Sequence, residues 1–262
     1  MMKKILSIAA IAAVGAVFSC QTEDTSLATP NGVSDEALAK IRALGFSTEN
    51  VQIVDDGYLV EGDIMLHAHD LEGPADSKKL RIAEVEQYHT FNLVNPQTIT
   101  VSVSGTVTSA FSNAVNNAIA RYNAQNLSIS MQRVSSGGDI NIKLVNTGRY
   151  IASAGFPDGR GNPYPTVSYA KKYSNYSDGF MTTVIAHEIG HCIGFRHTDY
   201  MNRAYSCGSG GNEGQETSGV GAVHIPGTPT GPDNASWMLA CLSSTTNRPF
   251  NANDREALDY LY

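Results

Sequence analysis

The chain has 262 residues, and its 18 basic and 25 acidic side chains give a formal net charge of −7 at pH 7. Hydrophobic residues make up 42% of the chain, which is enough for the core of one domain with a shorter segment before it. Because the balance is acidic and no basic cluster could follow a phosphate backbone, nucleic acid is not an expected partner.

The first residues have the pattern of a secretory signal. Lys3 and Lys4 precede an apolar stretch over 5–18 that is too short to span a membrane as a mature helix. Residues 17–20 resemble a bacterial lipobox, in which cleavage after residue 19 leaves Cys20 to carry a lipid, and the net charge becomes −9. We therefore expect a lipid-anchored protein of the outer membrane, at the cell surface or extracellular after processing. The alternative is ordinary secretion with Cys20 removed or left as a plain thiol.

Hydrophobic spacing predicts the elements in chain order. A short helix is expected over 35–44, with Ser34 as its cap, and partial alternation follows over 57–66. Further along, the pattern predicts strands over 98–103, 127–134, 139–145, 150–156 and 166–169, and helices over 108–124 and 178–193. A last helix is expected from about Asp254, capped by Asn253 with Glu256 three residues on.

These elements predict three regions. Residues 1–19 form a signal peptide, 20–85 a tether and probable pro-segment, and 86–262 the catalytic domain. The boundary between the last two is expected between about 70 and 95.

One stretch carries the chemistry. Within the second long helix and just beyond it the sequence reads H-E-x-x-H-x-x-G-x-x-H, with histidines at His187, His191 and His197. Residues four apart on a helix lie about 6 Å apart along its axis and near one another around it, so the first two histidines can hold one ion. Gly194 lets the helix end sharply, so that the third histidine can reach the same ion.

The motif indicates a catalytic zinc site. Three protein ligands leave the fourth position of Zn²⁺ open for water, and Glu188 can take a proton from that water as general base. The alternative is a surface binding or adhesion lipoprotein whose zinc site only braces the fold, but a structural site has no use for Glu188. Zinc hydrolysis of a non-peptide substrate is also compatible with the motif.

These residues resemble the metzincin clan of zinc endopeptidases, and more closely its bacterial branch named for the string HEIGH, which residues 187–191 spell. The resemblance implies an α+β fold: a twisted, mostly parallel sheet with long helices, an irregular C-terminal half, and a short pro-segment in front. It also implies a methionine turn beneath the zinc, which nominates Met238, and hydrolysis of internal bonds in a protein or peptide substrate. We expect the protein to be a monomer.

The chain departs from relatives in this clan at two places. Astacins and serralysins have a tyrosine two residues after the methionine, where this chain has Ala240, so another group or zinc alone must stabilise the oxyanion. After the third histidine come Thr198 and Asp199, and the sequence leaves open whether Asp199 contacts the ligands.

Three cysteines follow Cys20, and in an oxidising compartment they permit one disulfide by three pairings. Cys207 and Cys241 both lie in irregular, turn-rich sequence, which favours that pair. Pairings with Cys192, which falls in the zinc helix, remain open. A cysteine-based zinc site would need a close C-x-x-C pair, which the chain lacks.

Two further resemblances concern the cleft. Residues 151–157 look like the edge strand with which matrix enzymes pair an extended substrate, although an ordinary buried strand fits as well. Residues 60–63 resemble the F-x-G-D element of astacin pro-segments, which makes Asp63 a candidate latency ligand on zinc, or else part of a simple hairpin turn. The stretch 78–81, with three basic residues and one leucine, is the expected site of processing.

Overall fold

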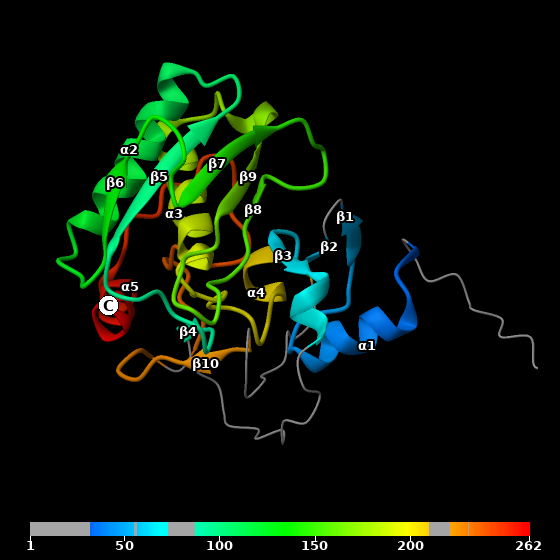
Figure 1. Cartoon of the computed structure of the whole chain (residues 1–262). Helices are drawn as coiled ribbons and strands as arrows, with labels where there is room; N and C mark the ends of the chain where they lie inside the picture. Colours follow the sequence, from blue (N-terminus) through cyan, green and yellow to red (C-terminus); the bar gives the residue numbers. More distant parts are fainter. Residues whose placement is uncertain (1–31, 55–56, 73–86, 210–220, 230) are drawn as a thin grey trace, which may run out of the picture.

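The computed structural model describes residues 32–54, 57–72, 87–209, 221–229 and 231–262 (Figure 1). The predicted signal peptide, Cys20 and the processing site at 78–81 lie outside these ranges. Among the helices described, none is both long enough and apolar enough to cross a membrane.

The elements follow one another along the chain as runs of strands separated by helices. They are α1 (Asp35–Ala43), β1 (Gln52–Val54), β2 (Gly57–Val60), β3 (Ile64–His67), η2 (Ala68–Glu72), β4 (Tyr88–His89), β5 (Thr98–Ser104), α2 (Ser109–Asn123), β6 (Ser130–Arg133), β7 (Ile140–Val145), β8 (Ala152–Ser153), β9 (Thr166–Ala170), η3 (Lys171–Tyr173), α3 (Asp178–Cys192), α4 (Ala204–Cys207), β10 (Val223–His224) and α5 (Ala252–Leu261).

A five-stranded sheet in the order β6-β5-β7-β9-β8 forms the upper part of the molecule. The first four strands in this order are parallel, and β8 pairs antiparallel with β9 at the edge. The mostly parallel sheet agrees with the predicted fold class. Buried β-branched residues on the central strands, such as Ile99, Val101 and Ile142, face the main core.

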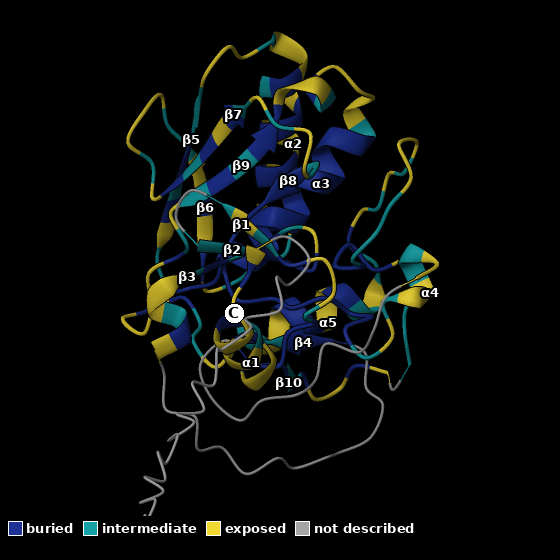
Figure 2. Ribbon diagram, turned by 90° about the vertical axis from the view of Figure 1, so that its right-hand side faces the viewer, coloured by how far each residue is buried: buried dark blue, intermediate teal, exposed yellow. Residues whose placement is uncertain are grey.

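Helices α2 and α3 lie side by side behind the sheet in Figure 1. The Thr108 hydroxyl accepts a hydrogen bond from the backbone N–H of Phe111 and so caps α2, and Ser177 caps α3 in the same way through Phe180. Every residue of α3 from Phe180 to Cys192 is buried, as the dark blue of Figure 2 shows. A helix buried on all sides is rigid, which suits a metal site.

The described residues before 73 form a separate layer that we call the leading segment (32–54 and 57–72). Strands β1, β2 and β3 make an antiparallel sheet, and α1 packs below them with its own small hydrophobic cluster, to which Phe156 also belongs. The predicted alternation over 57–66 is therefore two strands, because the turn at Glu61 and Gly62, both at positive φ, folds them into a hairpin.

The predicted strand over 150–156 is too long: β8 covers Ala152 and Ser153, and the C=O of Ile151 adds one bond from the N–H of Ala170 in β9. Ala154 bonds to the leading segment instead, since its C=O accepts from the N–H of Met65 and its N–H donates to the C=O of Asp63, at 2.8 and 2.9 Å. The edge of the five-stranded sheet is thus covered at Ala154 by the leading segment.

The predicted cap of the last helix is wrong by two residues. Asn251 caps α5, and its side chain and that of Asp254 each bond to the other's backbone N–H in a capping box. The amide of Asn253 instead donates to the carboxylate of Asp233 at 2.9 Å. Two asparagines lie near this start, and the reciprocal bond of Asp254 decides between them.

Candidate metal centre

The last two turns of α3 bring two imidazoles together. His187 and His191 both point to one side of the helix, and their Nε2 atoms lie 3.0 Å apart. Both residues are buried. The predicted helical pairing of these residues is present.

The chain turns sharply after α3 and returns with the third histidine. Gly194 has a φ of +109°, a conformation that an L side chain rarely adopts, and a Cβ there would lie 3.0–3.2 Å from the chain around residues 90–93. The turn carries His197 to within ring contact of His187 and His191, with centroids 5.3 and 4.9 Å away. The predicted role of Gly194 in turning the chain agrees with this geometry.

Backbone carbonyls orient the first two imidazoles. The Nδ1–H of His187 donates to the C=O of Trp237 at 2.9 Å, and that of His191 to the C=O of Phe195 at 2.8 Å. Each Nε2 is then the acceptor and faces the common centre. Burial lowers the pKa of His191 well below its usual range, so this imidazole is neutral, as a metal ligand must be.

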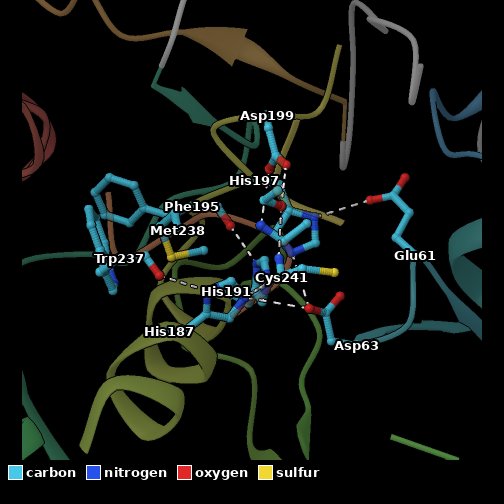
Figure 3. A network of polar contacts seen from close by, with 12 residues as sticks. Glu61, Asp63, His187, His191, Phe195, His197, Asp199, Trp237, Met238 and Cys241 are labelled. Carbon is cyan, nitrogen blue, oxygen red and sulfur yellow. Dashed lines mark hydrogen bonds and ion pairs between the residues drawn. The ribbon is translucent and has the colours of Figure 1, made fainter. Parts of the chain in front are cut away.

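The carboxylate of Asp63 completes the group (Figure 3). Its Oδ2 lies 3.2 Å from Nε2 of His197 and 3.5 Å from Nε2 of His187. Burial disfavours its charge, but the two histidines outweigh burial and hold the pKa of Asp63 well below its usual value.

One ligand atom from each of these four residues lies within 4.8 Å of every other. Three imidazole nitrogens and a carboxylate oxygen are donors that Zn²⁺ takes in tetrahedral sites. The residues present therefore fit the expected cofactor, one zinc ion.

Glu188 lies beside the metal ligands, where the sequence expected a base. It is buried, and burial together with the nearby charge of Asp63 raises the pKa of its carboxyl well above the usual range. It lines a cleft of about 250 Å³ together with Asp63, His187, Arg203 and Ala240. Within the described residues its Oε2 atom has no hydrogen-bond partner, so it is available for a ligand of the cleft.

Glu61 is a site residue that the sequence did not predict. Its Oε2 lies 3.6 Å from Nδ1 of His197, and its Oε1 lies 3.8 Å from Nη2 of Arg196. Figure 3 shows it reaching the ligand cluster from the side of the leading segment. The sequence did carry one signal, which is a pair of opposite charges next to site residues. Glu61 lies two residues before Asp63 in the turn, and Arg196 directly precedes His197.

The turn that carries Met238 packs against α3 at Gly190. A Cβ on Gly190 would lie 2.6 Å from the Met238 sulfur, and the C=O of Met238 accepts from the N–H of Thr198 at 3.0 Å. Asp199 is buried beside this turn. Its carboxylate accepts from the N–H of Ala240 and from the hydroxyl of Ser206, which ties the two ends of this region together.

Cys207 and Cys241 form a disulfide in the structure, across a sequence separation of 34. Cys192 is a free, buried thiol in α3 whose pKa is raised well above the usual range by burial. Of the three pairings that the sequence left open, the structure thus contains the one that joins α4 to the segment after Met238.

Comparisons with known proteins agree with this geometry. Residues 59–262 match the family described as dual-action HEIGH metallo-peptidase, peptidase M57, over more than half of the chain. The match includes the hairpin that carries Asp63. Two solved structures of myroilysin are similar at low level: one at 16% identity and TM-score 0.42, covering 65% of this chain and 82% of the other, and one at 15% and 0.43, covering 71% and 99%. No curated protein sequence matched.

Proposed function

Since the chain belongs to the HEIGH metallo-peptidase family and is a zinc metallopeptidase, we propose that it is an exported endopeptidase made in a latent form, with Asp63 as the blocking ligand. The observation that carries the proposal is the position of Asp63, whose Oδ2 lies 3.2 Å from His197 Nε2 inside the histidine cluster. Membership in a peptidase family favours this function over the alternative of an adhesion lipoprotein with a structural zinc site.

Each residue of the centre has a role in this proposal. His187, His191 and His197 hold the metal through Nε2, and Glu188 is the general base. When bound, Zn²⁺ polarises the scissile carbonyl and makes a coordinated water more acidic. Glu188 takes the proton of the attacking water and passes it to the leaving amine, and its raised pKa favours holding that proton between the two steps.

In this proposal, latency follows because Asp63 and a water molecule compete for the fourth coordination position of the zinc. A carboxylate is a competent fourth ligand, so Asp63 excludes the water that Glu188 would activate. Gly62 has a φ of +91°, a backbone conformation that L side chains rarely adopt, and so permits the turn that carries Asp63 to the histidines. The hairpin turn and the latency ligand, which the sequence offered as alternatives, are therefore compatible in one structure.

The leading segment is the proposed pro-segment, within the expected range 20–85. Support comes from its own hydrophobic cluster, which touches the catalytic part through Phe156. Processing at the basic residues 78–81 would separate it from the catalytic domain at 86–262 and would release that domain from a lipid on Cys20. The proposed location is the outer membrane and cell surface, on the strength of the signal and lipobox sequence.

Met238 is the proposed methionine of the turn beneath the metal centre. Its sulfur fills the space below Gly190, between the two helical zinc ligands, and this contact supports the assignment. The substrate is a protein or peptide, as the peptidase family implies. We propose that the enzyme acts as a monomer.

The test compares four forms of the full, unprocessed chain on a quenched peptide: wild type, Asp63→Ala, Asp35→Ala and the double variant Asp63→Ala with Glu188→Gln. Asp35 is an exposed acid of α1 and serves as the control within the leading segment. We expect activity before processing only in Asp63→Ala. The double variant should bind one zinc per chain and stay inactive. Its rate of peptide cleavage should be lower than that of Asp63→Ala by about 100-fold or more.

Equal activity of wild type and Asp63→Ala, with zinc bound in both, would overturn the latency proposal. Full activity in the double variant would overturn Glu188 as the base. Zinc content measured on each form separates both outcomes from a simple loss of metal.

A further inference from the structure

The leading segment places a second carboxylate in the cleft besides that of Asp63. Glu61 lies between two guanidinium groups, with its Oε1 3.8 Å from Nη2 of Arg196 and its Oε2 4.0 Å from Nη1 of Arg203. The side chains of Glu61 and Arg196 are fully buried, and that of Arg203 is 11% exposed. Charges buried to this degree are stable only when they are paired.

The backbone at Glu61 supports a specific use of its carboxylate. Its φ of +56° lies in the left-handed region, where glycine or asparagine is the inexpensive choice. A glutamate at this position strains the turn, and its side chain is aimed away from solvent into the cationic pair. Its contacts with Arg196 and Arg203 offset that strain.

Glu61 also occupies the place where a substrate side chain would lie. The leading segment pairs through its backbone with Ala154, at the free edge next to β8, and Asp63 enters the metal centre from that pairing. Glu61 and Arg203 line the same cleft as His187 and Glu188. The segment thus covers both the edge and the metal, which are the surfaces that an extended peptide needs.

We infer that Arg196 and Arg203 form a subsite that selects an acidic side chain in the substrate, and that Glu61 occupies this subsite in the unprocessed chain. This inference rests on the proposed function, because the subsite becomes accessible only when the leading segment leaves.

Both arginines are held by contacts that remain after the leading segment leaves. Arg196 follows Phe195 directly before a proposed metal ligand, and its backbone N–H donates to the C=O of Tyr88 at 2.8 Å. Its guanidinium lies over Phe46 of the leading segment at 4.1 Å and near Phe156 of the catalytic part at 5.7 Å, so one aromatic partner stays.

Arg203 stands at the start of α4, which the disulfide between Cys207 and Cys241 ties to the segment after Met238. Its Nη1 lies 3.2 Å from Nδ1 of His197. Release of the leading segment would remove Glu61 and leave two neighbouring positive charges, of which that of Arg203 lines the cleft and that of Arg196 lies behind it. A carboxylate of the substrate offers both guanidinium groups the fork geometry that they prefer.

The test uses the processed enzyme and sets of quenched peptides that carry Glu, Gln or Lys at one position at a time on either side of the scissile bond. Scanning every position is needed because the leading segment runs parallel to the edge at Ala154, and a substrate could run either way. We expect one position at which Glu exceeds Gln in kcat/KM by about tenfold or more, since a charged pair gains that much over a neutral one.

Two variants of Arg203 test whether its charge causes the preference for Glu. Lys172→Glu, at an exposed position, is the control. Arg203→Gln should weaken the preference for Glu at that position, and Arg203→Glu should abolish it, because the new carboxylate would lie beside the guanidinium of Arg196 and neutralise the subsite. The ratio between peptides is unaffected by a uniform loss of folded enzyme, so it separates a subsite from a structural role.

Equal cleavage of Glu and Gln peptides at every position by wild type would overturn the subsite and leave the peptidase intact. A preference unchanged in both Arg203 variants would overturn it as well. Failure of the processed, zinc-loaded enzyme to cleave any peptide would contradict the proposed function, and the subsite with it.

Discussion

Gly190 and the sulfur of Met238 meet with no room between them: a Cβ on Gly190 would lie only 2.6 Å from Sδ, and the next nearest atom is Nε1 of Trp237 at 3.2 Å. The glycine therefore sets how closely α3 approaches the turn below it. Since His187 takes its orientation from the C=O of Trp237, the same approach fixes the direction of a metal ligand.

We predict that Gly190→Ala destabilises the protein and weakens zinc binding. Overpacking of a close contact costs about 1–3 kcal/mol, against which alanine regains about 1 kcal/mol of helix propensity. The measurements are thermal unfolding with and without a chelator, and competition for zinc with a coloured indicator. Gly148→Ala is the control, because a Cβ there meets nothing within 4 Å. Unchanged unfolding and zinc affinity in Gly190→Ala would contradict the contact.

The metal centre was predictable where its geometry is local. Two ligands on one helix follow from a spacing of four residues, and Gly194 follows from the need to turn the chain before His197. The longer strands and the long helices were also accessible, because hydrophobic periodicity records which face of each element is buried. The family match supports the recognition of the HEIGH branch and its zinc.

The contacts of the leading segment were not predictable in the same way. Glu61 and Arg196 lie far apart in the sequence, and their pairing depends on how a separate hairpin docks against the edge next to β8. Sequence pattern also merged β2 and β3 into one stretch, since it could not show that Glu61 adopts a positive φ. At the start of α5 the choice between Asn251 and Asn253 rests on one reciprocal side-chain bond.

Glu61→Gln should loosen the leading segment without changing Asp63, the proposed latency ligand. Removing one partner of a buried ion pair costs roughly 3–5 kcal/mol, because Arg196 would remain charged and poorly paired. We expect faster processing of the full chain by an added protease and a shorter lag before peptide cleavage. The isosteric glutamine keeps the shape of the side chain, so the effect reports the charge.

The matched control is Glu49→Gln, an exposed acid of the same segment. If the two glutamine variants are processed at the same rate as wild type, Glu61 does not hold the segment in place. Zinc content should be the same in all three forms, since Asp63 and the histidines are unchanged.

The disulfide between Cys207 and Cys241 should contribute substantially to stability. It closes a loop across a sequence separation of 34, and cross-linking a loop of that size lowers the entropy of the unfolded chain by an amount worth about 4 kcal/mol. A reductant should therefore lower the unfolding temperature of wild type. The double variant Cys207→Ser with Cys241→Ser should unfold at the lower temperature with or without reductant.

Cys192→Ala serves as the control that also tests the pairing. This thiol is buried in α3 and free, so the variant should keep the response to reductant that wild type shows. Because the disulfide ties α4, which follows Arg203, to the segment after Met238, reduction should also lower peptide cleavage by the processed enzyme. Loss of the reductant response in Cys192→Ala, or an unfolding temperature of wild type that ignores reductant, would contradict the bond between Cys207 and Cys241.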